Sequence, residues 1–471
     1  MISTIIKNWV CCLGFAFFWF PLLVLWATGC SDTTPKVLHT EYAEPWPPAQ
    51  SPDLVGRLEP FDRNAVYNRD LYVAPHGDDH TGDGSEAAPF ETLQRAAKDA
   101  RPGTRIRLSA GRHKPVGTLA DLHGERRAPI AIVGHEKAII DGTLSEEVTP
   151  GIHLSNPRYV VLENLNIRNA YPHGVNIDEG GDYSAPAGPL VLRRLHIANI
   201  GRGRNNDCLK MSGVKNFHVL ESHFSGCDRG EAIDMVGCHE GFISGNTFRD
   251  MPGSGVQTKG GSSNVTIHGN RFINIALRSV NLGGHTGAPF FRPQDAPFEA
   301  ARIQVVSNIF YRSGDAAVAF VGCIDCLSAH NTIIDPQGHV VRLLEEHPER
   351  AVGRGGRFVN NLVAFSVADL KGYVTAGRHS RPDTFILGWN LWYAHDMKDL
   401  KGPQYDPGIP PEQSAVIGKA PRFRDPAGGD YRLDPESPAI GQALEMAGTN
   451  LPDYDYRARG FPPTIGAHGA P

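Results

Sequence analysis

The chain has 471 residues, of which 41% are hydrophobic and 8% aromatic, and its formal net charge is −5. The sequence shows no basic stripe, which argues against nucleic acid as a partner. Its 52 glycines and 36 prolines indicate very many turns. Long helical patterns of apolar residues are missing, so the composition favours an all-β fold over a helix bundle or a doubly wound sheet.

The N-terminus has the pattern of an export signal. Lys7 precedes an apolar run from Val10 to Trp26, and small residues follow. Cys30 directly after Gly29 resembles a bacterial lipobox, although Ala27 stands where that motif usually has Leu. The resemblance implies a signal peptide over residues 1–29 and lipidation of Cys30. The alternative is a plain signal peptide or a single membrane anchor, since a run of about 17 residues is at the short limit for spanning.

Lipidation implies a place in the bacterial cell envelope. Ser31 after the cysteine favours the outer membrane, with the periplasm or the cell exterior as the alternative compartments. Residues 30–66 are rich in Pro, Glu, Ala and Ser, and we expect a disordered tether there. The remainder, residues 67–470, is predicted to form one domain and to be monomeric, with the membrane contacted only through the lipid anchor.

Five cysteines lie beyond the export region, and an odd number cannot all pair internally. They are Cys208, Cys227, Cys238, Cys323 and Cys326. The spacing of Cys323 and Cys326 is that of metal ligands, but no second pair or histidine follows at zinc-site spacing. A local disulfide or buried free thiols are therefore expected.

A short phrase recurs along the middle of the chain: an apolar strand, an Asn, one further residue and a large apolar residue. Its asparagines are Asn246, Asn270, Asn308, Asn331, Asn361 and Asn390. Repeats of roughly 20 to 50 residues are typical of solenoids. Because the asparagines occupy the same place in each coil, we expect them to form an internal hydrogen-bonded ladder at a bend. A leucine-rich repeat is the rival solenoid, but no copy sustains its spacing.

A second short strand follows each phrase, with alternating apolar and polar residues. These pieces are 174–178, 208–211, 232–235, 255–259, 279–282 and 317–320. Alternation places Val, Leu, Ile and Met inward and the polar residues outward. Two strands per coil predict a parallel β-helix.

The ends of the solenoid support the same fold. Residues 90–100 form an amphipathic pattern with Leu93 and Ala96 on one face, which predicts a helix that caps the N-terminal end. Phrases such as Leu71-Tyr-Val-Ala-Pro-His-Gly77, residues 101–108 and Ile139-Ile-Asp-Gly142 closely resemble the opening of the pectate-lyase-like parallel β-helix superfamily. The resemblance covers roughly residues 70 to 467 and implies a right-handed parallel β-helix. It is specific for the fold rather than for a reaction.

Registering the second strands on their inward residues predicts a polar patch on one sheet face. The first outward column is Asn176, Lys210, Asp234, Gln257, Asn281 and Ala319. The second outward column is Asp178, Ser212, Val236, Lys259, Gly283 and Val321. The leading edge holds His173, Asp207, Glu231, Ser254, Arg278 and Ala316. A solvated sheet face is polar in any case, but the mixed charges here also suit a groove for sugar acids.

Cleavage of a uronate by β-elimination needs a cation on the carboxylate and a base for the C5 proton. Asp207, Glu231 and Asp234 come from adjacent coils and are hard oxygen ligands suited to Ca²⁺. Lys259 and Lys210 are the candidate bases, and either would need a lowered pKa. Residues 255–259 with Gly269-Asn-Arg-Phe272 loosely resemble the catalytic coil of polysaccharide lyase family six, which implies Lys259 as the base. That family has Arg-His-Gly on the next coil, where this chain has Val280-Asn-Leu-Gly283 and Arg278 nearby.

Further residues of the patch are candidates for binding substrate. Arg278 is predicted to contact a carboxylate, and Gln257 and Asn281 to bind sugar. A long insertion, residues 285–300, is expected either to wall a groove or simply to pack, and it adds His285 and Arg292 as candidates.

The resulting hypothesis is a surface β-helix protein that binds or cleaves acidic polysaccharide, as a lyase or a C5 epimerase. The alternatives are a non-catalytic glycan-binding or structural β-helix, and a glycoside hydrolase that uses two of the three carboxyl groups.

Overall fold

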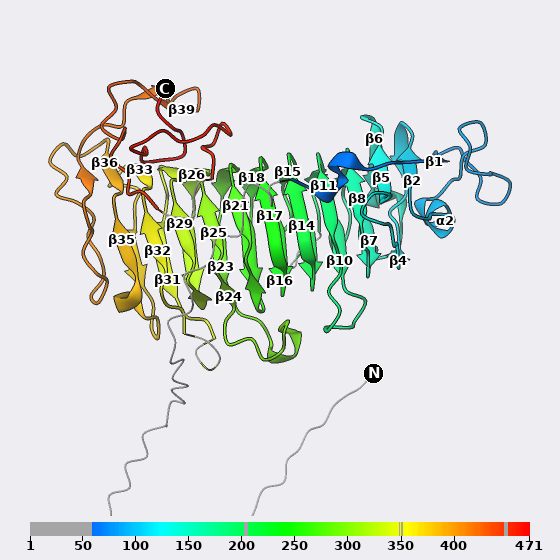
Figure 1. Ribbon diagram of the computed structural model, residues 1–471, viewed down its shortest axis with the longest axis horizontal. Helices are drawn as coiled ribbons and strands as arrows, with labels where there is room; N and C mark the ends of the chain where they lie inside the picture. The colour runs from blue at the N-terminus through cyan, green and yellow to red at the C-terminus, as the bar shows by residue number, and fades with distance from the viewer. Residues whose placement is uncertain (1–58, 202–205, 348, 350–351, 447–450) are drawn as a thin grey trace, which may run out of the picture. The chain divides into compact units, whose positions relative to one another are not determined.

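The computed structural model describes residues 59–201, 206–347, 349, 352–446 and 451–471. The predicted signal peptide, the lipidation site Cys30 and most of the tether therefore lie outside the described residues. The described chain winds into a right-handed parallel β-helix, which confirms the predicted fold (Figure 1). No helix in these ranges is long and apolar enough to cross a membrane.

Three parallel sheets, here named A, B and C, run along the coil. Sheet A consists in spatial order of β1 (Arg69–Val73), β2 (Thr104–Leu108), β5 (Ile130–Gly134), β8 (Val160–Glu163), β11 (Leu190–Arg193), β14 (Lys215–Leu220), β17 (His239–Ser244), β21 (Thr266–His268), β25 (Gln304–Val306), β29 (Leu327–Ala329), β32 (Arg357–Val359) and β35 (Ile386–Gly388), with β20 (Ser262–Ser263), β24 (Ala300–Ala301) and β28 (Cys323–Ile324) beside them. Sheet B consists of β3 (Gly111–His113), β6 (Ala138–Asp141), β9 (Asn166–Arg168), β12 (His196–Ala198), β15 (His223–Ser225), β18 (Thr247–Met251), β22 (Arg271–Ile275), β26 (Ile309–Ser313), β30 (Thr332–Ile334), β33 (Leu362–Phe365), β36 (Leu391–Ala394) and β37 (Val416–Ile417). Sheet C consists of β4 (Thr118–Ala120), β7 (Ile152–Ser155), β10 (Val175–Asp178), β13 (Leu209–Ser212), β16 (Ile233–Val236), β19 (Val256–Lys259), β23 (Arg278–Gly283), β27 (Ala316–Val321), β31 (His339–Leu344) and β34 (Gly372–Ala376).

The repeated phrase forms the turn from sheet A to sheet B, and its asparagines form the predicted ladder. The Oδ1 of each asparagine after Asn246 accepts hydrogen bonds from the backbone N–H and the side-chain amide of the preceding asparagine, and Asn246 Oδ1 accepts from the Ser222 backbone N–H. Asn270 Nδ2, for example, donates to Asn308 Oδ1 at 3.0 Å, and Asn308 Nδ2 donates to Asn331 Oδ1 at 3.0 Å. Next to the ladder, Phe224, Phe248, Phe272 and Phe310 stack face to face inside the coil.

The N-terminal end carries the predicted helix in a shorter form, α2 (Leu93–Lys98), which buries Leu93 and Ala96 against β1 and β2. Before it, η1 (Phe61–Asn64) lies on the outer face of sheet A, where Phe61 packs with Ala131, Val161 and Val191. The ordered region thus begins before residue 67, because these apolar outward residues of sheet A need a cover.

The C-terminal segment packs on the outside of sheet B. Tyr431, Leu433, Ala439 and Ile465 bury the outward residues of β26, β30, β33 and β36 (Figure 1). This segment includes the antiparallel pair β38 (Phe423–Asp425) and β39 (Asp430–Leu433). The remaining short helices are η2 (Gly142–Leu144), η3 (Ala288–Phe290) and η4 (Pro382–Thr384).

The five cysteines of the domain form two disulfides and one buried free thiol. Cys323 pairs with Cys326, as expected for a local bridge, and Cys208 pairs with Cys227, while Cys238 is free. Cys208 directly follows Asp207, so the second bridge ties down the turn that carries this candidate site residue.

Candidate functional site

The register of sheet C confirms the predicted outward column. Asn176 pairs with Lys210, Lys210 with Asp234, Asp234 with Gln257, and Gln257 with Asn281. Val236 pairs with Lys259 in the second column. The polar residues of the patch therefore lie side by side on neighbouring strands, with Asp234, Gln257 and Asn281 largely buried.

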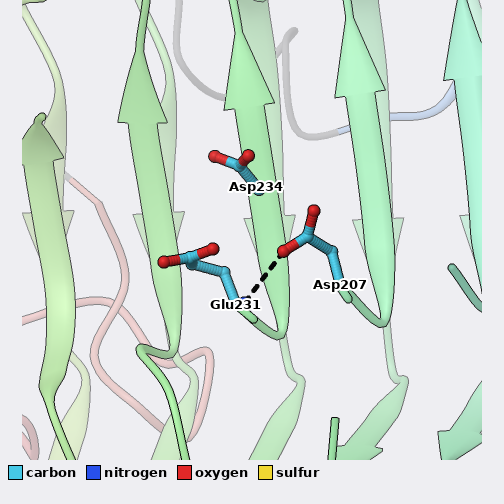
Figure 2. A group of neighbouring side chains, drawn as sticks. All are labelled: Asp207, Glu231 and Asp234. Atoms are coloured by element: carbon cyan, nitrogen blue, oxygen red, sulfur yellow. Dashed lines mark hydrogen bonds between the residues drawn. The ribbon is translucent and has the colours of Figure 1, made fainter. Parts of the chain in front are cut away.

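Three carboxyl groups converge at the centre of this patch. Asp207 and Glu231 precede β13 and β16, Asp234 lies within β16, and the three point toward one another (Figure 2). One oxygen from each lies within 4.8 Å of the others. Asp207 Oδ1 accepts a hydrogen bond from the Glu231 backbone N–H at 2.9 Å, whereas its buried Oδ2 accepts none in the described part of the chain. The geometry thus brings the predicted ligand set together.

Both predicted lysines contact this acidic cluster. Lys210 Nζ donates to Asp234 Oδ2 and lies 3.8 Å from Asp207 Oδ2. Lys259 Nζ lies 3.3 Å from Asp234 Oδ1. Three carboxyl groups against two ammonium groups leave the cluster short of positive charge.

The electrostatics of the cluster reflect that shortage. Burial and the neighbouring Asp234 raise the pKa of Asp207 to about 6, and burial with both aspartates raises the pKa of Glu231 to about 8. Burial also acts to raise the pKa of Asp234, but Lys210 and Lys259 outweigh it and the pKa is lowered. A divalent cation with a preference for oxygen ligands would relieve the repulsion among these groups.

Lys210 does not meet the condition set for a base. Its burial acts to lower its pKa, but Asp234 and Asp207 outweigh that effect and the pKa is raised. Lys210 therefore stays protonated at neutral pH and acts as a fixed counter-charge. With Lys210 excluded, Lys259 is the remaining candidate base of the two predicted lysines.

Gln257 and Asn281 extend the patch away from the cluster as a hydrogen-bonded chain. Gln257 Nε2 donates to Asp234 Oδ1 at 3.4 Å, and Asn281 Nδ2 donates to Gln257 Oε1 at 2.9 Å. Arg278 continues the chain by donating to Asn281 Oδ1 at 3.1 Å, but it also donates to Asp315 and Glu346. Arg278 thus lies apart from the acidic cluster, held by two carboxylates.

The insertion, residues 285–300, lies along the C-terminal ends of the sheet C strands. Arg292 packs against the turn at Gly237. A Cβ added to Gly237 would come within 2.3 Å of the Arg292 side chain. Its guanidinium is buried, donates to Glu179 Oε1 at 2.9 Å and lies 3.8 Å from the Tyr183 ring centroid. Arg292 is therefore occupied inside the protein and fixes the loop, whereas His285 stays exposed with Nδ1 3.0 Å from the Glu346 carbonyl.

His173 has a role that the sequence did not single out. Its Nδ1 accepts a hydrogen bond from the Asp207 backbone N–H at 3.1 Å, and burial lowers its pKa to about 4. The ring is therefore neutral with its hydrogen on Nε2. Its place at the leading edge beside Asp207 was visible in the sequence, but its acceptor role depends on the turn geometry.

Part of the sequence resembles a known protein family and a known enzyme. Residues 150–335 match the family described as "Right handed beta helix region". The pectate lyase PEL9 of Emericella nidulans is 26% identical over 212 residues, which cover 39% of this chain and 47% of that protein. The chain thus matches about half the length of this curated relative.

Solved structures with a similar fold include two that extend over most of the chain. The complex of XylC with xylose is 10% identical, with a TM-score of 0.50 over 85% of this chain and 98% of that one. The pectate lyase Pel9A is 15% identical, with a TM-score of 0.46 over 86% of this chain and 98% of that one. The family match and the sheet topology both give the fold as a right-handed parallel β-helix.

Proposed function

We propose that this protein is a polysaccharide lyase that cleaves acidic polysaccharide by β-elimination on the outer face of sheet C. The observation that carries the proposal is the cluster of Asp207, Glu231 and Asp234 with Lys259 against it. A pectate lyase among the relatives supports the same chemistry. Fold alone does not decide function, so the proposal depends on the site.

The residues divide into a cation site and a base. Asp207, Glu231 and Asp234 would hold Ca²⁺, which when bound supplies the positive charge that neutralises the uronate carboxylate. The neutral amine of Lys259 accepts the C5 proton. The electrons of the C5–H bond form the C4–C5 double bond, and the C4–O bond breaks. The departing oxygen receives a proton from water. Lys210 remains protonated and keeps Asp234 ionised and oriented.

The geometry favours this chemistry over glycoside hydrolysis. A hydrolase needs an acid and a second carboxylate that reach the two sides of the scissile bond. Asp207 and Asp234 are both 0% exposed, and Asp234 contacts two lysines, so neither is placed to act on an anomeric carbon. C5 epimerisation shares the proton removal and differs in that a proton is returned to C5 without loss of the C4 oxygen.

The test measures the ultraviolet absorbance of unsaturated uronate on a panel of uronate polysaccharides, with Ca²⁺ and with chelator. We expect product in Ca²⁺ only, and a loss of about 10²–10⁴-fold in kcat for Lys259→Ala. Lys215→Ala, which removes a lysine from sheet A, is the matched control and should keep full activity. Exchange of the C5 proton in D₂O without unsaturated product would instead establish an epimerase. Binding of these polysaccharides without either reaction would establish a glycan-binding protein.

We also propose that lipidation at Cys30 anchors this activity in the cell envelope, where polysaccharide outside the cytoplasm is accessible. Metabolic labelling with a radioactive fatty acid should mark the wild type, and the label should be absent from Cys30→Ala. Equal labelling of both proteins would contradict the anchor.

A further inference from the structure

The polar surface of sheet C continues on the N-terminal side of the acidic cluster. Thr118 of β4 pairs with His153 of β7, and His153 pairs with Asn176 of β10. At the usual strand spacing, β10 lies about 10 Å from β16 and β7 about 15 Å from it. Arg292 and its loop border the strand ends at Gly237, and a long polymer that is bound at the cluster and lies across the strands would pass over β10 and β7.

Three side chains on these strands form a hydrogen-bonded relay. His153 Nε2 lies 2.6 Å from Asp178 Oδ2, and Thr118 Oγ1 lies 2.8 Å from His153 Nδ1. Since the Asp178 carboxylate only accepts, His153 donates to it through the Nε2 hydrogen. Ser155 adds a hydrogen bond to Asp178 Oδ1 at 2.9 Å. These two donors are therefore used within the relay, and the Asp178 carboxylate presents acceptor oxygens on the outer face of sheet C.

The charges on the outer face of sheet C are distributed unevenly from strand to strand. Among their residues, strands β4, β7 and β10 contain neither Lys nor Arg. Strands β13, β19, β23 and β31 carry Lys210, Lys259, Arg278 and Arg342. Asp178 stays ionised, because the hydrogen bonds from His153 and its neighbours outweigh burial and lower its pKa. A uronate carboxylate on the N-terminal strands would thus meet an anion with no Lys or Arg of those strands to balance it.

We propose that Thr118, His153 and Asp178 form a subsite for an uncharged sugar. Hydroxyl groups donate to oxygen acceptors, whereas a carboxylate would be repelled. The preferred substrate is then an acidic heteropolysaccharide in which uncharged sugars neighbour the uronate, rather than a homopolymer of uronate. This inference rests on the proposed function and names the substrate class for the same face of sheet C.

The experiment compares a uronate homopolymer with a polymer in which uronates alternate with uncharged sugars, using the full-length protein and Ca²⁺. We expect kcat/KM to favour the alternating polymer by about tenfold or more, which corresponds to about 1.4 kcal/mol. Asp178→Asn should narrow that ratio severalfold, mainly by lowering KM for the homopolymer and with little change in kcat. Asp182→Asn, at a carboxylate in the loop after β10 that accepts hydrogen bonds from Ser184, is the matched control and should leave the ratio unchanged.

A preference for the homopolymer, or an unchanged ratio in Asp178→Asn, would overturn the subsite. Affinity electrophoresis with the same two polymers separates this failure from failure of the lyase proposal. Selective retardation by the alternating polymer that Asp178→Asn weakens supports the subsite even where no unsaturated product forms. Equal retardation by both polymers, or none by either, contradicts it.

Discussion

Glu412 ends the asparagine ladder by accepting a hydrogen bond from Asn390 Nδ2 at 2.8 Å. Asn390 is the last asparagine of the ladder within the described residues, and the Glu412 carboxylate stands where the next side-chain amide would be. Glu412 also accepts the hydroxyl hydrogen of Tyr405, which comes from the segment that follows the last long coil. The ladder that specifies the bend of each coil is thus closed by a residue outside the repeat.

The first prediction concerns the charge of Glu412. Burial raises its pKa, so the folded protein binds this proton more tightly than the unfolded chain does. Stability from this group is therefore present at low pH and declines as pH rises from the ordinary glutamate pKa through the raised one. Glu412→Gln keeps an acceptor for Asn390 and removes the charge, so it should stabilise the protein at neutral pH.

Urea unfolding of wild type and Glu412→Gln between acid and neutral pH checks this. The difference in the free energy of unfolding should be small at acid pH and grow in favour of the variant as pH rises. Glu445→Gln, at an exposed glutamate, is the control and should show no such trend. A constant difference across the range would mean that folding leaves the pKa of Glu412 unchanged and would contradict the prediction.

The second prediction concerns the interior of the ladder. Asn308 Nδ2 donates to the carbonyls of Ile267 and Val306, and Asn308 Oδ1 accepts from the Asn270 backbone N–H at 2.9 Å. Asn308→Ala leaves these buried groups without partners and should cost about 3 kcal/mol of unfolding free energy. Asn166→Ala, at a half-buried strand position outside the ladder, should cost less than about 1 kcal/mol. Similar losses in both variants would show that the ladder contributes no more than an ordinary side chain.

The sequence predicts the repeat well because its signals are local. Alternation within five residues fixes which side chain faces inward, and the inward residues then fix the register that places Lys210 beside Asp234. The acidic cluster follows from that register. The pKa values of its members were beyond prediction, because they depend on how deeply the turns bury each group.

The ion pairs that the loops form could not be predicted from the sequence either. Arg278 donates a hydrogen bond to Glu346, and Arg292 donates one to Glu179. Each pair is separated by a long stretch of chain with no repeating pattern. Both arginines were expected to bind substrate because they are cations near the patch. Their partners come from segments whose paths are set by the tertiary fold, so no sequence pattern pointed to these ion pairs.

The third prediction concerns the pair Arg292 and Glu179. Both side chains are buried, at 9% and 2% exposed, so removal of one leaves an uncompensated charge. Arg292→Met or Glu179→Gln alone should cost about 3–5 kcal/mol where unfolding of the whole domain is measured, and the double variant should cost less than the sum. A double-mutant cycle by chemical denaturation checks this, with the exposed pair Arg381 and Asp383 as control, for which the coupling should stay below about 1 kcal/mol. Additive losses at Arg292 and Glu179 would show that the loop is held by its other contacts.

The last prediction concerns cation binding by Asp207, Glu231 and Asp234. A ligand that binds only the folded state stabilises it by mass action, so Ca²⁺ at about 100 times its dissociation constant should add about 2.7 kcal/mol. Asp207→Asn keeps an oxygen for the Glu231 backbone N–H and removes one anionic ligand, so the rise in Tm with Ca²⁺ should shrink or vanish. Asp250→Asn, at an exposed aspartate on sheet B, should respond as the wild type does. Mg²⁺ should substitute poorly, because it demands a tighter octahedral site. An equal rise in Asp207→Asn would place the cation elsewhere, and no rise in the wild type would remove Ca²⁺ from the mechanism.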